Sequence, residues 1–162
     1  MAEASVLSQQ DRELFRDTFR KFLKNEVAPY YEQWEKDEIF PRELWHKLGQ
    51  NGFLAVDVPE EYGGYGADFA LSAIVIEEFS RHNYMALASS VSVHSDIVTP
   101  YIFHLGTEQQ KQQWLPKMVS GEAVGAIAMT EPGAGSDLQG MRTSAVLKDG
   151  QYSINGQKTF IT

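Results

Sequence analysis

The spacing of apolar residues changes near residue 121, and this change constrains the fold more than any other feature of the sequence. Up to Gly121 the apolar residues recur at the spacing of one helix face. After Glu122 the chain has short runs rich in β-branched and aromatic residues, separated by turns that contain glycine. Helices followed by strands are typical of an α+β protein. We therefore expect a helical domain over residues 1–121 and a β domain over residues 122–162.

The first part of the chain predicts about five helices. Ser8 with Asp11 is a helix-start signal. Pro41 suits the first position of a second helix, which Gly52 would end. The apolar face of the first helix is predicted to comprise Leu14, Phe15, Thr18, Phe19, Phe22 and Leu23.

Three further helices are expected before the change of pattern. The helix that starts at Asp68 is apolar around much of its circumference, so we expect it to be buried between other helices. The segment 85–105 is rich in small residues and contains Pro100, which predicts a kink or break near Thr99. Thr107 caps the fifth helix.

Four short segments of the β domain are candidates for strands: the apolar run 123–130, then 143–147, 152–154 and 159–162. Asp149-Gly150 lies between two of them and is a strong hairpin signal. Four strands without a clear cover would leave open edges, which proteins normally pair or protect. We therefore expect this part to be the incomplete beginning of a larger antiparallel domain.

Composition excludes several functions. The chain has 22 acidic residues against 14 Lys plus Arg, which argues against binding nucleic acid or an anionic membrane. It has no cysteine, so it offers no disulfide, thiolate nucleophile or zinc–cysteine site. Its four histidines lack ligand spacing, so no metal site is expected. No secretory signal or membrane-spanning run is visible, which favours a cytoplasmic protein.

The segment from Met129 to Gly140, MTEPGAGSDLQG, has the most unusual composition in the chain. Its glycines would let backbone N–H groups approach an anion such as a pyrophosphate. It is neither the dinucleotide fingerprint nor a Walker loop, because the spacing and the flanking segments differ. Spacing alone favours a simpler interpretation, a long turn whose Gly and Pro were selected for geometry.

Four ordered motifs give this loop a context. AMTEPGAGSD closely resembles the signature of the acyl-CoA dehydrogenase family. PEEYGG at 59–64, HLGTEQQKQQWLP at 104–116 and NGQKTFIT at 155–162 resemble further motifs of the same family, in the same order. The resemblance covers essentially the whole chain. The segment 136–140 and the small-residue helix lean toward the long-chain branch.

The resemblance implies an α+β fold, with an N-terminal all-α helical domain followed by the incomplete beginning of an antiparallel β-barrel domain. It implies FAD as cofactor, with Ser136 near both the FAD pyrophosphate and the CoA thioester arm. Thr130 would bond the pyrimidine side of the isoalloxazine ring, and Thr162 would lie near N5. The residues implied to bind the cofactor are Ile127, Met129, Thr130, Gly135, Ser136, Phe160, Ile161 and Thr162. Phe160 stands where many members have Trp, so it keeps the stacking role but offers no indole N–H.

The family reaction is oxidation of an acyl-CoA thioester to the trans-2-enoyl-CoA, in fatty-acid β-oxidation. A carboxylate removes the α-proton while the β-hydrogen passes to flavin N5 as hydride. The family carries that glutamate in a later helical domain, beyond residue 162, so we assign no catalytic residue and expect this chain alone to be inactive. Expected partners are an acyl-CoA, an electron-transfer flavoprotein and further subunits of a homo-oligomer. A eukaryotic member would work in the mitochondrial matrix, although no transit peptide is visible.

The glutamates that are present fit structural roles better than catalysis. Glu60-Glu61 and Glu77-Glu78 are adjacent pairs, which point apart on a helix and are typical of a solvated surface. Glu131 is interpreted as a structural anchor of the flavin loop. Two other functions remain open from the sequence: an acyl-CoA oxidase-like relative, and a stand-alone, non-catalytic helical module for binding or dimerisation.

Overall fold

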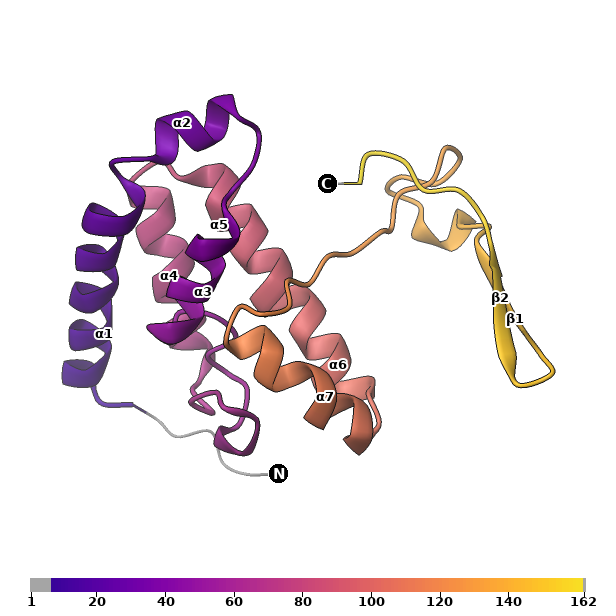
Figure 1. The fold of residues 1–162 in the computed structure, drawn as a ribbon, viewed down its shortest axis with the longest axis horizontal. Helices are drawn as coiled ribbons and strands as arrows, with labels where there is room; N and C mark the ends of the chain where they lie inside the picture. The colour runs from indigo at the N-terminus through magenta and orange to yellow at the C-terminus, as the bar shows by residue number, and fades with distance from the viewer. Residues whose placement is uncertain (1–6, 162) are drawn as a thin grey trace. The chain divides into compact units, whose positions relative to one another are not determined.

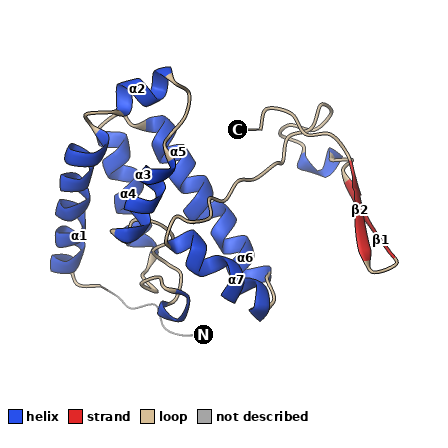
Figure 2. Cartoon of the chain, in the orientation of Figure 1, coloured by secondary structure: helices blue, strands red, loops and turns tan. Residues whose placement is uncertain are grey.

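The computed structural model describes residues 7–161, and the chain divides into two compact units, Met1–Gly125 and Ala126–Thr162 (Figure 1). The first unit is helical, and both strands of the described residues lie in the second unit (Figure 2). This arrangement confirms the predicted α+β class. The two-stranded sheet is not closed into a barrel.

The first unit is a bundle in which α1 packs on α4, α4 on α5, and α6 on α7. Short 3-10 and π-helical turns, labelled η, connect or interrupt the α-helices. In chain order the elements are α1 (Gln9–Phe22), η1 (Leu23–Val27), α2 (Tyr31–Lys36), α3 (Arg42–Gln50), η2 (Glu60–Tyr62), α4 (Phe69–Arg81), α5 (Met85–Ser92), η3 (Val93–Val98), α6 (Thr99–Leu105) and α7 (Glu108–Val119).

The helix starts predicted at Ser8 and Thr107 are confirmed by their caps, whereas Pro41 is the N-cap of α3 and not its first residue. The Asp11 backbone N–H donates to the Ser8 hydroxyl, and the Asp11 carboxylate accepts from the Ser8 backbone N–H in return. Thr107 and Gln110 form the same reciprocal capping box at the start of α7. Each box supplies partners for backbone N–H groups that a helix leaves unpaired at its first turn.

Aromatic side chains form the centre of the helical core. Phe19 of α1 meets Phe53 edge-on, with 4.6 Å between ring centroids, and meets Phe79 of α4 at 5.0 Å. Both geometries are ones that aromatic rings favour. The predicted apolar face of α1 is correct for Phe19, whereas Leu14 is wrong because 66% of it remains exposed.

The segment 85–105 continues as helix through Pro100, so the break predicted near Thr99 is wrong (Figure 1). The turn before the proline is π-helical, spanning η3. Proline has no N–H to offer the preceding turn. The His94 carbonyl accepts from the Thr99 backbone N–H, and also from the Thr99 hydroxyl at 2.7 Å. A local π-bulge therefore accommodates Pro100.

Glu78 corrects the prediction that Glu77 and Glu78 form a solvated surface. The Glu78 side chain is fully buried, while Glu77 remains partly exposed. Arg16 of α1 pairs with Glu78, and Arg20 donates to both of its carboxylate oxygens, at 2.7 and 3.0 Å. The contacts span 58 to 62 residues of sequence, so no local pattern reveals them. The ion pairs of Glu78 with Arg16 and Arg20 link α1 to α4 at the edge of the core.

His94 is fully buried at the π-helical turn and bridges two segments of the first unit. Its Nδ1 accepts from the Gly125 backbone N–H at 2.9 Å, and its Nε2 lies 3.1 Å from the Met118 carbonyl. These partners require a neutral ring protonated on Nε2. Burial lowers the pKa of His94 from 6.5 to about 4. His94 is thus a buried residue that holds this helix to the segments of Met118 and Gly125.

The second unit contains the hairpin of β1 (Ser144–Lys148) and β2 (Gln151–Asn155), preceded by the short helix η4 (Leu138–Gly140). The strands pair antiparallel around the predicted Asp149-Gly150 turn. Two predicted strands are wrong in the described residues. The run 123–130 is irregular, and residues 159–161 form no strand. Both strands are exposed on both faces, so this unit has no sheet-based core.

Substitution of Glu78 by Gln should lower the free energy of unfolding by about 2–3 kcal/mol, because two arginines lose a charged acceptor. Urea denaturation followed by circular dichroism measures this loss. Glu77→Gln is the matched control, since the exposed neighbour should change stability little. Equal effects of the two substitutions would contradict a structural role for the buried carboxylate.

The stability of the chain should fall as the pH is lowered from 6.5 to 5. Above pH 6.5 the His94 ring is neutral in both the folded and the unfolded state. Below it the unfolded state binds a proton that the folded state excludes until the pH nears 4. The expected loss down to pH 5 is about 2 kcal/mol.

Urea denaturation at several pH values measures this slope. His94→Gln should flatten the profile, whereas the same substitution of His104, which is exposed, should leave it in place. A flat wild-type profile over this range would show that His94 titrates normally.

Candidate functional site

Two segments predicted to contact the cofactor lie against each other in the second unit. The Thr159 backbone N–H donates to the Thr130 carbonyl at 3.0 Å. The Lys158 ammonium donates to the Met129 carbonyl at 3.1 Å, across 29 residues of sequence. The backbones that carry Met129, Thr130 and Phe160 are therefore joined within one small unit.

Glu131 is the centre of this arrangement, and only 7% of the residue is exposed. Its carboxylate accepts from the backbone N–H groups of Arg142, at 2.7 Å, and Thr143, at 3.0 Å. The Lys158 ammonium lies 2.9 Å from the same carboxylate. The Arg142 N–H, with further contributions from Thr143 and Lys158, lowers the pKa of Glu131 to about 2.

A carboxylate with this set of donors is ionised at neutral pH and already fully engaged. A general base needs a pKa nearer the working pH and a free oxygen that can reach the proton it removes. Glu131 meets neither requirement. Its interpretation as a structural anchor is confirmed, and it is not a candidate for proton abstraction.

The glycine loop closes directly after Glu131. The Glu131 N–H donates to the Ala134 carbonyl at 3.0 Å, and the Ala134 N–H donates back at 3.1 Å. Within the described residues, a Cβ added at Gly133 or Gly135 would meet no atom within 4 Å. Neither glycine has the left-handed φ that disfavours other residues. Turn geometry alone therefore does not explain them, and the open space beside them would allow a ligand to approach the backbone closely.

Apolar side chains around the loop remain open to solvent. Phe160 is 92% exposed, Ile161 42% and Met129 38%. Phe160 also has a φ of 54°, a conformation that bulky residues rarely adopt and that is often found at ligand sites. An exposed aromatic ring on a constrained backbone can cover a planar ligand.

The remaining predicted residues offer polar groups. In the described part of the chain, the hydroxyls of Thr130 and Ser136 form no hydrogen bond, and Ser136 is exposed. Ile127 is half-buried. Thr162 lies outside the described residues. The exposed apolar groups, the open glycines and the free hydroxyls fit a flavin nucleotide, which presents a flat ring and a pyrophosphate.

Sequence reasoning missed Lys158 as a member of this site. A lone lysine in a strand-like motif is usually a solvated surface residue. The only available signal was its position two residues before Phe160. The Glu131 partner is 27 residues away, so only the folded chain shows the pair.

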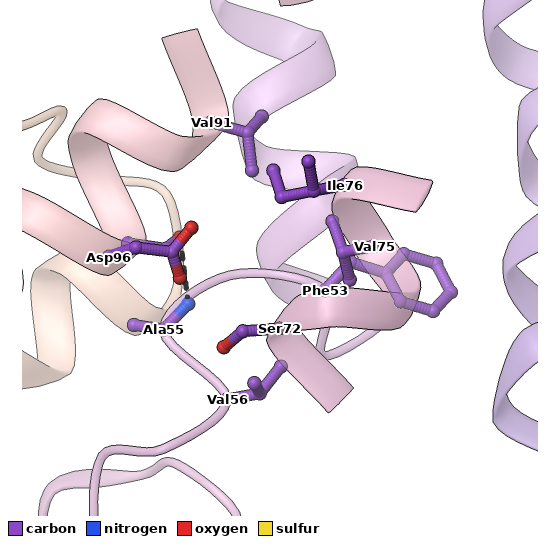
Figure 3. A pocket seen from close by; sticks show the side chains of 9 residues that line it. Phe53, Ala55, Val56, Ser72, Val75, Ile76, Val91 and Asp96 are labelled. Carbon is purple, nitrogen blue, oxygen red and sulfur yellow. Dashed lines mark hydrogen bonds between the residues drawn. The ribbon is translucent and has the colours of Figure 1, made fainter. Parts of the chain in front are cut away.

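A small cavity of about 10 Å³ lies in the helical unit between α4, α5 with η3, and the segment 53–56 (Figure 3). The Ser95 hydroxyl accepts from the Ala55 N–H at 3.0 Å beside it. Burial raises the pKa of Asp96 on the same wall. Such a volume holds about one water. The small residues here thus serve helix packing and leave no room for an acyl chain in this cavity.

The described residues contain no group of three or more His, Cys, Asp or Glu side chains placed to hold a metal ion. Between residues 7 and 161, none of the helices combines the length and apolar character needed to cross a membrane.

The family follows from comparison of whole domains. Residues 9–122 match the model of the acyl-CoA dehydrogenase N-terminal domain, and residues 126–162 match that of the acyl-CoA dehydrogenase middle domain. The chain belongs to the acyl-CoA dehydrogenase family.

Particular relatives refine this placement. The mitochondrial long-chain specific acyl-CoA dehydrogenase of Rattus norvegicus is 47% identical over 94% of this chain and 35% of its own length. The crystal structure of an acyl-CoA dehydrogenase from Geobacillus kaustophilus is 51% identical, with a TM-score of 0.87 over 98% of this chain and 41% of that one.

A second similar structure was solved with FAD bound. The acyl-CoA dehydrogenase of Bacillus anthracis complexed with FAD is 38% identical, with a TM-score of 0.87 over 95% of this chain and 27% of that one. This chain thus spans well under half the length of the relatives described.

Proposed function

We propose that this chain forms one wall of the FAD site in an acyl-CoA dehydrogenase. The observation that carries the proposal is the joining of the 127–136 and 158–161 segments beside two glycines that the local fold does not require. Close approach of a cofactor to the loop would account for the joined segments and for the two glycines. We also keep the boundary predicted from the sequence, 1–121 and 122–162, as the proposed domain division.

Each residue of the wall has a proposed role that matches its exposure. The free Thr130 hydroxyl would bond the pyrimidine side of the flavin ring, and Ser136 would contact the pyrophosphate and the CoA thioester arm. Exposed Phe160 and Ile161 would cover the ring, with Thr162 near N5. Backbone N–H groups at Gly135 would face the pyrophosphate, as open loops do for anions.

The proposed reaction is the oxidation of an acyl-CoA to the trans-2-enoyl-CoA. FAD, when bound, supplies the hydride acceptor. The residues of this chain would bind and orient the ring and exclude water from one side of it. We assign no residue of this chain to proton removal, because the Glu131 carboxylate is fully engaged.

The biological setting is proposed from the relatives. The rat protein is named for long-chain acyl-CoA, and the 136–140 segment leans the same way, so a long-chain substrate is favoured. An electron-transfer flavoprotein is the proposed electron acceptor, and a homo-oligomer the proposed assembly. A cytoplasmic location, or the mitochondrial matrix in a eukaryote, fits an enzyme of fatty-acid β-oxidation.

A chimera should test the proposal directly. This chain would replace the matching segment of the Geobacillus kaustophilus acyl-CoA dehydrogenase, with which it is 51% identical. We expect the purified chimera to be yellow and its visible flavin band to bleach with a long-chain acyl-CoA. The 162-residue chain alone should retain little FAD, because it offers only one wall of the site.

A chimera that folds, as judged by circular dichroism, but binds no FAD would refute the proposal. Tight stoichiometric FAD on the isolated chain would refute the expectation that one wall is insufficient. Reoxidation of the bleached chimera by oxygen at a catalytic rate would favour an oxidase over a dehydrogenase.

Substitution of Gly135 by Ala should show whether this glycine leaves space for a ligand or is needed for the conformation of the turn. The new methyl group meets no protein atom, so the unfolding midpoint should not change. In the chimera, FAD affinity should fall by about tenfold or more, because the new methyl group occupies the space in which the cofactor would approach the backbone. Fluorescence titration of the apoprotein with FAD measures the change.

Gly156→Ala is the matched steric control, because its Cβ would collide with Thr143. This control should lower stability, whereas Gly135→Ala should not. Unchanged FAD affinity in Gly135→Ala would return the glycines to a role in the turn alone.

A further inference from the structure

Within residues 7–161, the segment 158–161 is held to the segment 129–131 by Lys158 and by one backbone hydrogen bond. The carboxylate of Glu131 already holds the start of β1 through the N–H groups of Arg142 and Thr143. The segment 158–161 is held to the 129–131 segment by the Thr159 N–H and by the Lys158 ammonium. Of these, only the ammonium contacts the Met129 carbonyl and the Glu131 carboxylate together.

The charge on Lys158 makes its contacts the stronger part of this link. Hydrogen bonds with an ionised donor or acceptor are about twice as strong as neutral ones. Here both the ammonium and the carboxylate are charged, and their side chains are only 25% and 6% exposed. Such a site screens the attraction less than open solvent does. The Lys158 ammonium therefore contributes more than the Thr159 N–H to holding the segment 158–161 against the segment 129–131.

The same lysine lies two residues before Phe160 in the chain. Residues 159–161 form no strand, so no ladder of backbone hydrogen bonds fixes them in the described residues. Phe160 nevertheless adopts a left-handed φ with its ring exposed. A strained conformation persists only where its surroundings restrain it. The restraints on the preceding side are Thr159 and Lys158.

We propose that Lys158 is a positioning residue for the flavin: its ammonium, held between the Met129 carbonyl and the Glu131 carboxylate, sets the spacing between the glycine loop and Phe160 before the cofactor arrives. This inference rests on the proposed function, because the spacing matters only where a flavin spans both segments. The lysine would act through the backbone and would not touch the cofactor.

Hydrogen exchange on the full 162-residue chain tests the positioning without any cofactor. Lys158→Met removes the ammonium and keeps most of the side-chain length. Protection of the Thr159 amide should fall by about tenfold or more in this variant. Lys158→Arg should restore most of the protection, because its guanidinium can also donate to two acceptors. Lys148→Met, at an exposed lysine of β1, is the matched control and should change nothing.

Amides of β1 and β2, which lie in the same unit as Lys158, report in the same experiment whether that unit is folded in each variant. Unchanged Thr159 protection in a folded Lys158→Met variant would overturn the proposal. So would a loss of protection that Lys158→Arg fails to restore, because the charge would then not be the cause.

The flavin readout uses the chimera described above. Lys158→Met should weaken FAD binding by about tenfold and shift the visible flavin band, and Lys158→Arg should reverse most of both changes. If the parent chimera binds no FAD, the proposed function fails. If the parent binds FAD and Lys158→Met binds it equally with the same spectrum, only the positioning role fails. Weaker binding with normal Thr159 protection would also overturn it, since the lysine would then contact the cofactor directly.

Discussion

A carboxylate removed from water must be surrounded by hydrogen-bond donors, and each unit of this chain satisfies that requirement once. In the helical unit the carboxylate is Glu78, paired with Arg16 and Arg20 across α1 and α4. In the second unit it is Glu131, with two backbone N–H groups and Lys158. The helical unit also has an aromatic core, but the second unit has a hairpin exposed on both faces. The order of the second unit therefore depends on Glu131.

This dependence places the proposed flavin wall on a polar scaffold. Glu131 follows Thr130 directly, and its partner Lys158 comes two residues before Phe160. The residues that would face the ring thus lie beside the residues that hold the backbone, with Phe160 exposed and Thr130 half-buried. A binding site benefits when its contacts are fixed before the ligand arrives, because less order is lost on binding. The open glycines between them leave the space that such a ligand needs.

Local features of the fold were predictable wherever the cause was local. The capping boxes at Ser8 and Thr107 and the hairpin turn at Asp149-Gly150 depend on residues a few positions apart. The strand predicted at 159–162 was wrong for its described residues, since a strand requires a partner and sequence cannot supply one. The break predicted near Thr99 was wrong because the helix runs into Pro100 through a π-helical turn, in which the Thr99 N–H bonds the His94 carbonyl.

The sequence by itself determined the order of helices and strands, the family and the loop 127–136 as the candidate cofactor wall. These follow from periodicity and from motifs that are contiguous along the chain. Only the tertiary structure decided that Glu78 is buried, which donors hold Glu131 and that Lys158 joins the two halves of the wall. Each of those outcomes depends on a partner 11 to 62 residues away, and a charge with a distant partner has the same sequence pattern as a solvated one.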